Sequence, residues 1–103
     1  MSRVRFRPQA RAEIREARGW YESRVPGLGR AFISEVDTTI SFLRLHPQMY
    51  AAVSDDEQVR RALLHRFPYS IVYEIVTPHE IVVLSCRHVR QDEMNWHLSR
   101  RDV

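Results

Sequence analysis

The hydrophobic and polar positions of the first half of the chain follow two different periods. Apolar and basic residues alternate over residues 3–7, which predicts a short half-buried strand. Pro8 then suits the first turn of a helix, and apolar residues recur behind it at helical spacing as far as Val25. Residues 26–29 break this pattern, and a second apolar stripe covers residues 32–43. Two helices joined by so short a break are expected to form an antiparallel hairpin.

The second half of the chain changes to an extended pattern. Three successive strands are predicted at residues 59–66, 70–76 and 80–87, with a turn at 77–79 between the last two. Residues 91–98 then suit one or two helical turns. The order strand, helix, helix, strand, strand, strand predicts an α+β domain. In it a helical hairpin packs on a small, mainly antiparallel sheet and a short helical tail follows.

Length and composition restrict the class of protein. The 103 residues suit a single domain spanning residues 1–103. No apolar run approaches the roughly 20 residues of a membrane helix, and residues 1–10 lack the apolar segment of a signal peptide, so we expect a cytoplasmic protein without membrane contact. The single Cys86 is expected to be buried. It excludes an internal disulfide and a multi-cysteine metal site, and the scattered histidines do not indicate a metal either.

The basic residues are all arginines. The chain has 16 of them, no lysine and a formal net charge of +3. Guanidinium groups are planar forks that suit carboxylate or phosphate. Three of them, Arg11, Arg15 and Arg18, fall on the outer face of the first predicted helix. This pattern favours an acidic partner, with a solvated basic surface as the alternative.

Several large apolar residues have roles that the pattern also predicts. Tyr73 is expected in the core, and Trp20 is expected to pack at the edge of the first helix's apolar stripe. Ile33 and Phe42 flank the stripe of the second helix and are expected to widen its buried face. Leu45 lies well off that stripe, so it either widens the same face or contacts a partner.

The end of the last predicted strand gathers the groups with the best prospects for function. Arg87 and His88 follow directly on a buried apolar run, and Arg90 comes two residues later. A strand end holds charged side chains rigidly, so we expect a site there. His88 is the side chain in this group that can exchange a proton near neutral pH.

Several short segments stand together in a characteristic order along nearly the whole chain. They are residues 19–22, 26–32, 46–50, 59–61, 67–73, 87–90 and Trp96. In this order and spacing they resemble the RelE/ParE superfamily of bacterial toxins from type II toxin–antitoxin systems. The resemblance implies the same fold that the periodicity predicts.

The resemblance also implies a partner. Such a toxin is neutralised by an antitoxin encoded beside it, which carries a DNA-binding part and a partly disordered acidic segment. We therefore expect a hetero-oligomer in which antitoxin carboxylates pair with Arg11, Arg15 and Arg18 and apolar side chains reach Leu45. No cofactor is implied.

The superfamily divides by mechanism, and the chain departs from one branch. RelE-like members cleave messenger RNA on the ribosome, which requires a base, an acid and cations around the phosphate. This chain has no lysine, carries Ser70 where an arginine would follow Tyr69, and has Trp96 where a tyrosine often closes the tail. A ParE-like toxin that binds a protein such as DNA gyrase fits better, with Arg87, His88, Arg90 and Trp96 as target contacts.

Two alternatives remain open, and so does the question whether the chain is an enzyme. One is a ribosome-dependent ribonuclease in which Arg61, Arg87 and His88 are the catalytic candidates. The other is a module without toxicity that acts only in a complex with the antitoxin to regulate transcription.

Overall fold

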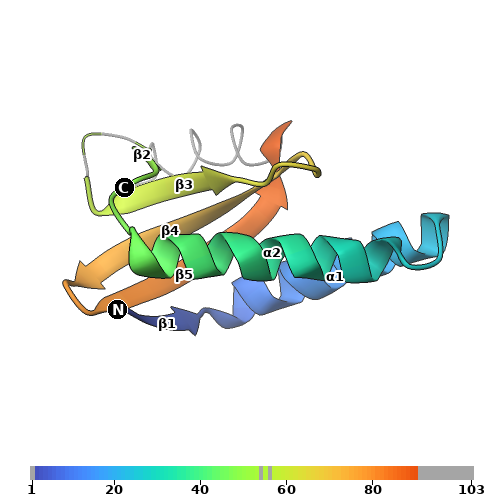
Figure 1. Ribbon diagram of the computed structural model, residues 1–103, viewed down its shortest axis with the longest axis horizontal. Helices are drawn as coiled ribbons and strands as arrows, with labels where there is room; N and C mark the ends of the chain where they lie inside the picture. The colour runs from blue at the N-terminus through green and yellow to red at the C-terminus, as the bar shows by residue number, and fades with distance from the viewer. Residues whose placement is uncertain (1, 54, 56, 91–103) are drawn as a thin grey trace.

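The computed structural model describes residues 2–53, 55 and 57–90 (Figure 1). The elements are β1 (Arg3–Phe6), α1 (Pro8–Arg24), α2 (Leu28–Leu45), β2 (Ala51–Ala52), β3 (Val59–Leu63), β4 (Tyr69–Thr77) and β5 (Glu80–His88). The first helix begins at Pro8, as its position in the sequence predicts. The predicted C-terminal helical turns lie outside the described residues.

One five-stranded sheet forms the back of the molecule in Figure 1, with strand order β1-β5-β4-β3-β2. β1 runs parallel to β5, and the other three pairings are antiparallel. This confirms the predicted α+β architecture with a mainly antiparallel sheet. β1 is short, and its register pairs it only with residues 80–83 of β5. Beyond Val83, β5 has no strand beside it on this edge within the described part of the chain.

The break between the two helices is held by one carboxylate. Glu22 accepts hydrogen bonds from the backbone N–H groups of Gly27 and Gly29, at 3.0 Å in each case. These two bonds, that from Gly27 first, lower the pKa of the Glu22 carboxyl. Gly27 has φ 91°, which other residues rarely adopt. A side chain at Gly29 would place its Cβ 2.9 Å from the Arg18 carbonyl oxygen, so the hairpin needs glycine at both positions.

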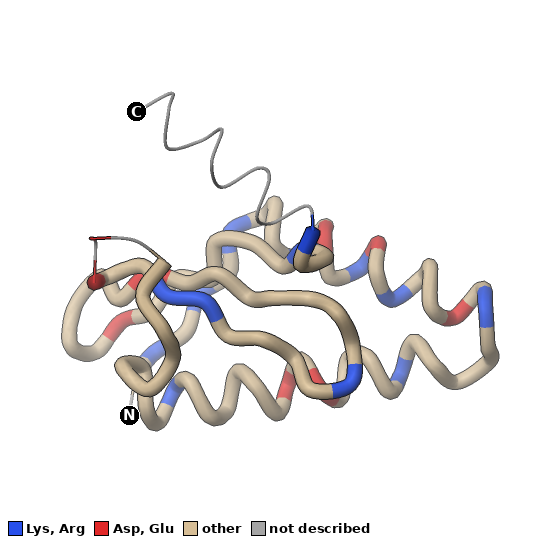
Figure 2. Tube along the Cα trace, turned by 90° about the horizontal axis from the view of Figure 1, so that it is seen from above, with Lys and Arg blue, Asp and Glu red and all other residues tan. Residues whose placement is uncertain are grey.

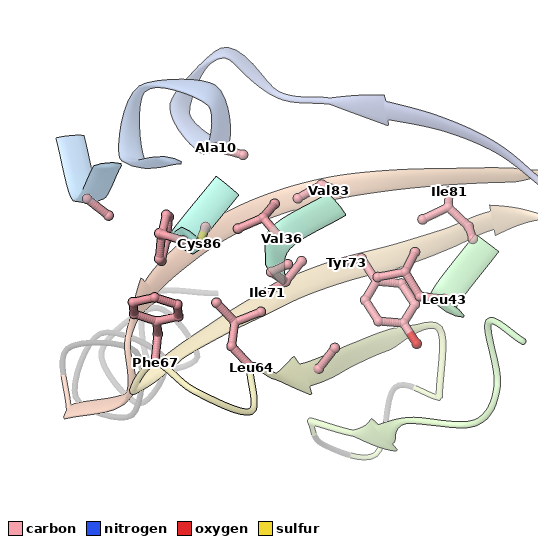
Figure 3. Close-up of a cluster of buried hydrophobic side chains, with 13 residues drawn as sticks. Ala10, Val36, Leu43, Leu64, Phe67, Ile71, Tyr73, Ile81, Val83 and Cys86 are labelled. Atoms are coloured by element: carbon pink, nitrogen blue, oxygen red, sulfur yellow. The ribbon is translucent and has the colours of Figure 1, made fainter. Parts of the chain in front are cut away.

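Both helices bury their apolar stripes against the same face of the sheet. Figure 3 shows this core, with Val36 and Leu43 of α2 directed toward Ile71, Tyr73, Ile81 and Val83 of the central strands. α1 contributes the small residues Ala10 and Ala17. Cys86 is buried among these residues, as predicted. The helical hairpin is therefore fixed on the sheet over most of its length.

Tertiary contacts shorten one predicted strand and add another. The prediction of a strand over 59–66 was wrong at its end, because β3 stops at Leu63. There Glu35 of α2 accepts the backbone N–H groups of both His65 and Arg66, which turns the chain away from the sheet. The two-residue strand β2 was not predicted, since two residues are too few to show a period.

One apolar residue of α2 also differs from expectation. Phe42 does not widen the buried face, because its side chain is 51% exposed, whereas Ile33 packs against the core. Leu45 and Met49 are similarly exposed, at 58% and 56%. The C-terminal end of α2 and the residues after it therefore present apolar side chains to the outside.

An arginine and a tyrosine close the core near β2. Tyr73 is fully buried, as predicted, and its hydroxyl donates a 2.6 Å hydrogen bond to the Pro47 carbonyl oxygen. Burial raises the pKa of Tyr73 to about 12. Arg60 donates to three carbonyl oxygens, those of Gln48, Tyr50 and Glu57, at 3.1, 2.8 and 3.0 Å. These bonds fasten the segment between α2 and β3 to the sheet.

Candidate functional site

A cleft of about 870 Å³ separates α1 from the adjoining ends of β4 and β5. Its floor is mostly aromatic and apolar, and includes Ala17 and Tyr21 of α1, Tyr69 of β4 and Cys86 of β5. The Tyr21 and Tyr69 rings lie 6.0 Å apart in an edge-to-face arrangement. Burial is the main cause that raises the pKa of Tyr69, and its hydroxyl makes no hydrogen bond to a described residue.

Trp20 lines the open side of the cleft. The expectation that it packs at the edge of the helix was wrong, because its side chain is 51% exposed. The guanidinium of Arg24 lies 4.6 Å from the Trp20 ring centroid. An exposed tryptophan beside a hollow is a frequent anchor point for a protein partner.

The charged rim is organised around an ion pair between α1 and β5. Arg87 Nε donates to Glu13 Oε2 at 2.7 Å, and the other oxygen of Glu13 accepts the Cys86 backbone N–H at 2.9 Å. Both side chains are about a quarter exposed. The shortness of β1 makes this arrangement possible, because the edge of β5 beyond Val83 is open to a side chain from α1.

His88 stands next to this pair on β5 and also lines the cleft. Its ring meets the Tyr69 ring edge to face at 5.6 Å. The Arg90 backbone N–H donates to His88 Nδ1 at 3.3 Å, which leaves Nε2 to carry the proton of the neutral ring. The prediction that Arg87, His88 and Arg90 come together at the strand end is consistent with this geometry.

The charges of the cleft nearly balance. Arg87 and Arg90 line it together with Glu13 and Glu16, so its formal charge is zero when His88 is neutral. Across residues 2–53, 55 and 57–90, no group of three or more His, Cys, Asp or Glu side chains is placed to hold a metal ion. What the cleft offers is an apolar floor and a few oriented hydrogen-bond donors.

Comparison with known proteins assigns this chain to a family. The family model for the ParE toxin of the type II toxin–antitoxin system parDE matches residues 4–93. The chain belongs to the ParE toxin family. A toxin of this family is a component of a type II toxin–antitoxin module, so an antitoxin is its expected partner.

Two solved structures share the ParE toxin fold of this chain. A chain of the chromosomal ParDE toxin–antitoxin system from P. aeruginosa is 20% identical with a TM-score of 0.71, covering 85% of this chain and 96% of that one. A chain of the RelBE2 toxin–antitoxin complex from Mycobacterium tuberculosis is also 20% identical, with a TM-score of 0.57, covering 84% and 96%. No curated protein matches the sequence.

The other predicted site residues that the structure describes in this ParE toxin lie away from the cleft. Arg61 is on β3, paired with Val72, and does not line the cleft with Arg87 and His88. The exposed residues Arg11, Arg15 and Arg18 lie on the side of α1 opposite the cleft-lining residues, at ~100° per residue. Figure 2 shows the alternation of basic and acidic positions along α1. Trp96 lies outside the described residues.

Sequence reasoning predicted the cleft residues Arg87, His88 and Arg90 and missed the side of the cleft that α1 contributes. Glu13, Glu16, Ala17 and Tyr21 all line it. Ala17 and Tyr21 belong to the apolar stripe that the helical spacing predicts, whereas Glu13 and Glu16 had no predicted role. Their spacing of three, one and four residues places all four on one side of α1, which was a usable signal. The sequence held no sign that this side faces β5.

None of the described helices of the toxin is long and apolar enough to span a bilayer.

Proposed function

We propose that this ParE toxin inhibits growth in the cytoplasm by binding a protein target, for which DNA gyrase is the candidate, and that an acidic antitoxin neutralises it. The observation that carries the proposal is the cleft, with its aromatic floor, exposed Trp20 and balanced charge. Protein interfaces are built on such aromatic anchors with a limited number of polar contacts.

The same cleft is poorly suited to RNA. Binding of a nucleic acid depends on an excess of cations along its phosphates. Here two glutamates oppose two arginines, and Arg87 is already paired with Glu13. RNA cleavage would also need a base in the cleft. Burial and the neighbouring charges, Glu16 among them, raise the pKa of Tyr69, so little of the phenolate that could act as this base is present at neutral pH.

A gyrase assay tests the target. Purified toxin added to gyrase and relaxed plasmid should reduce supercoiling, and His88→Gln should weaken the inhibition at least tenfold. Arg7→Gln is the matched control, because it removes one exposed charge outside the cleft and should inhibit like the wild type. Full supercoiling at a large excess of wild-type toxin would exclude gyrase as the target.

The ribonuclease remains a second candidate, because Arg87 and His88 do line one cleft. Primer extension on translated messenger RNA separates the two functions. Cuts that appear with the wild type and vanish with His88→Gln would support cleavage, whereas intact RNA during growth arrest supports protein binding.

The antitoxin contacts are proposed from exposed charge and apolar surface. Arg11, Arg15 and Arg18 form an accessible row on α1, and Leu45 is exposed beside Phe42 on α2. An extended acidic segment that wraps around the toxin could reach both. An acidic antitoxin encoded beside the toxin gene, co-expressed with the toxin, should restore growth and yield a stable complex.

A further inference from the structure

Among the described residues, Arg87 is held in place through one of its nitrogen atoms. Nε binds Glu13, while the two terminal amino groups make no hydrogen bond to a described residue. Glu13 itself accepts a hydrogen bond from the Cys86 backbone N–H, so the carboxylate that orients the Arg87 guanidinium is also held in place. An oriented guanidinium edge is a ready receptor for a second carboxylate, because little side-chain entropy is lost on binding.

The neighbouring residue adds a donor of defined character. Because His88 Nδ1 accepts the Arg90 N–H, the neutral ring carries its hydrogen on Nε2, and no described residue takes that hydrogen. Arg90 itself is exposed and also lines the cleft. Arg87, His88 and Arg90 thus place several donors that have no partner among the described residues at one end of the cleft, which we call the donor end.

Apolar surface begins directly beside the donor end. The His88 ring touches that of Tyr69 edge to face, and Tyr69 in turn meets Tyr21. The small side chain of Ala17 leaves room between them and Trp20. A ligand that satisfies both parts carries an anionic group a few bonds away from an aromatic or large aliphatic group.

We propose that the donor end is a carboxylate receptor. An acidic side chain of the antitoxin binds there, with a neighbouring apolar side chain on the aromatic floor, and so excludes the toxin's target from the same cleft. This inference rests on the proposed function, since it names how the partner blocks the site. Neutralisation is then direct competition for the cleft.

Charge decides between a carboxylate and a nucleic-acid phosphate. Glu16 also lines the cleft, and a chain of phosphates passing it would meet repulsion without an excess of cations. A single carboxylate aimed at Arg87 carries one negative charge and meets less of this repulsion than a chain of phosphates does. The toxin's net charge of +3 favours an acidic partner in addition.

The receptor can be tested with a small probe on the full-length toxin. 3-Phenylpropionate carries a carboxylate close to an aromatic ring, and 3-phenylpropionamide has the same shape without the charge. In an NMR titration of ¹⁵N-labelled toxin, the acid should shift the Arg87 Nε–H, the amides of residues 86–90 and the Trp20 indole. Half-saturation is expected at about 1–10 mM, as suits a ligand of this size.

Three outcomes overturn the receptor. They are equal shifts with the amide, no shifts at saturating acid, and tighter binding of inorganic phosphate than of 3-phenylpropionate. Two variants should each weaken the binding of 3-phenylpropionate at least fivefold: Arg87→Lys, which keeps the charge but loses the planar guanidinium, and His88→Gln. Arg7→Gln should bind as the wild type does, and shifts that survive both cleft variants would locate the probe elsewhere.

The purified complex with the antitoxin tests the occupant. Saturation with antitoxin should abolish the shifts at residues 86–90, whereas unchanged probe binding in the complex would overturn the claim that the antitoxin fills the cleft. The proposed function has its own readouts, growth and supercoiling, so its failure is distinguishable. If the toxin inhibits gyrase but does not bind 3-phenylpropionate, the proposed function stands and the carboxylate receptor is rejected.

Discussion

Two regions of this ParE toxin use an arginine and a tyrosine in opposite ways. At the β2 end, Arg60 donates to three backbone carbonyl oxygens, and the Tyr73 hydroxyl donates to a fourth. At the donor end of the cleft, Arg87 uses one nitrogen, and the Tyr69 hydroxyl has no partner among the described residues. The first pair completes the fold internally, and the second leaves bonding capacity for a partner.

The difference teaches where to look for function in a small domain. An arginine that donates to three backbone carbonyls, as Arg60 does, contributes to stability and has less left for recognition. An arginine oriented by one carboxylate is both ordered and available. Substitutions at the two regions should therefore separate loss of stability from loss of activity.

Arg60→Ala should lower the free energy of unfolding by about 2–3 kcal/mol, because three carbonyl groups lose a charged donor at once. Urea unfolding followed by circular dichroism measures this loss. The folded fraction should still inhibit growth, and Arg7→Gln should unfold like the wild type. A stable Arg60→Ala toxin without activity would reverse the assignment of the two regions.

Tyr73→Phe should cost about 1–2 kcal/mol near neutral pH, since it leaves the Pro47 carbonyl without its donor. Burial raises the pKa of Tyr73 to about 12, against about 10 in an unfolded chain. The contribution of this group is complete below pH 10 and is lost as the pH rises from 10 to about 12. Denaturation at several alkaline pH values should therefore show the gap between wild type and variant closing, and a constant gap would contradict this.

Glu13→Gln should cost about 1 kcal/mol, because the amide oxygen can still accept the Cys86 N–H while the attraction to Arg87 is lost. The Arg87 Nε–H resonance should broaden or move, which reports the loosened guanidinium. A variant with wild-type stability and an unchanged resonance would show that Glu13 does not orient Arg87.

His88→Gln should change the free energy of unfolding by no more than about 0.5 kcal/mol, because the ring is partly exposed and accepts one long backbone hydrogen bond within the described part of the chain. Growth inhibition should nevertheless fall at least tenfold. If wild type and His88→Gln unfold alike but differ in growth inhibition, the contrast between the two regions is supported. A His88→Gln variant that is as toxic as the wild type would show that this residue is not part of the target surface.

Periodicity predicted most of the fold because most of it is encoded locally. The start of α1 at Pro8, the break after Val25 and the hairpin of β4 and β5 all follow from short-range patterns. The end of β3 does not, because the carboxylate that turns the chain there belongs to Glu35, some thirty residues earlier. An effect of that kind is invisible until the elements are packed.

The site was predictable on one side only. The cluster at the end of β5 is visible in the sequence, since Arg87, His88 and Arg90 follow one another closely. Its counterpart on α1 is not, because Glu13 lies 74 residues from Arg87 and reads as an ordinary exposed helix position. Trp20 was misjudged for a related reason: an aromatic residue beside a helical apolar stripe looks the same whether it packs inward or stands open.

The brevity of β1 has a consequence for how copies of this toxin avoid one another. A strand that lacks a neighbour exposes its backbone amides as a template for further pairing, which invites aggregation. Along the part of β5 beyond Val83, which no strand covers among the described residues, the Cys86 amide is already bonded to Glu13. A negative charge therefore lies where an incoming strand would pair. The carboxylate that orients Arg87 thus also blocks this backbone position against pairing with another strand.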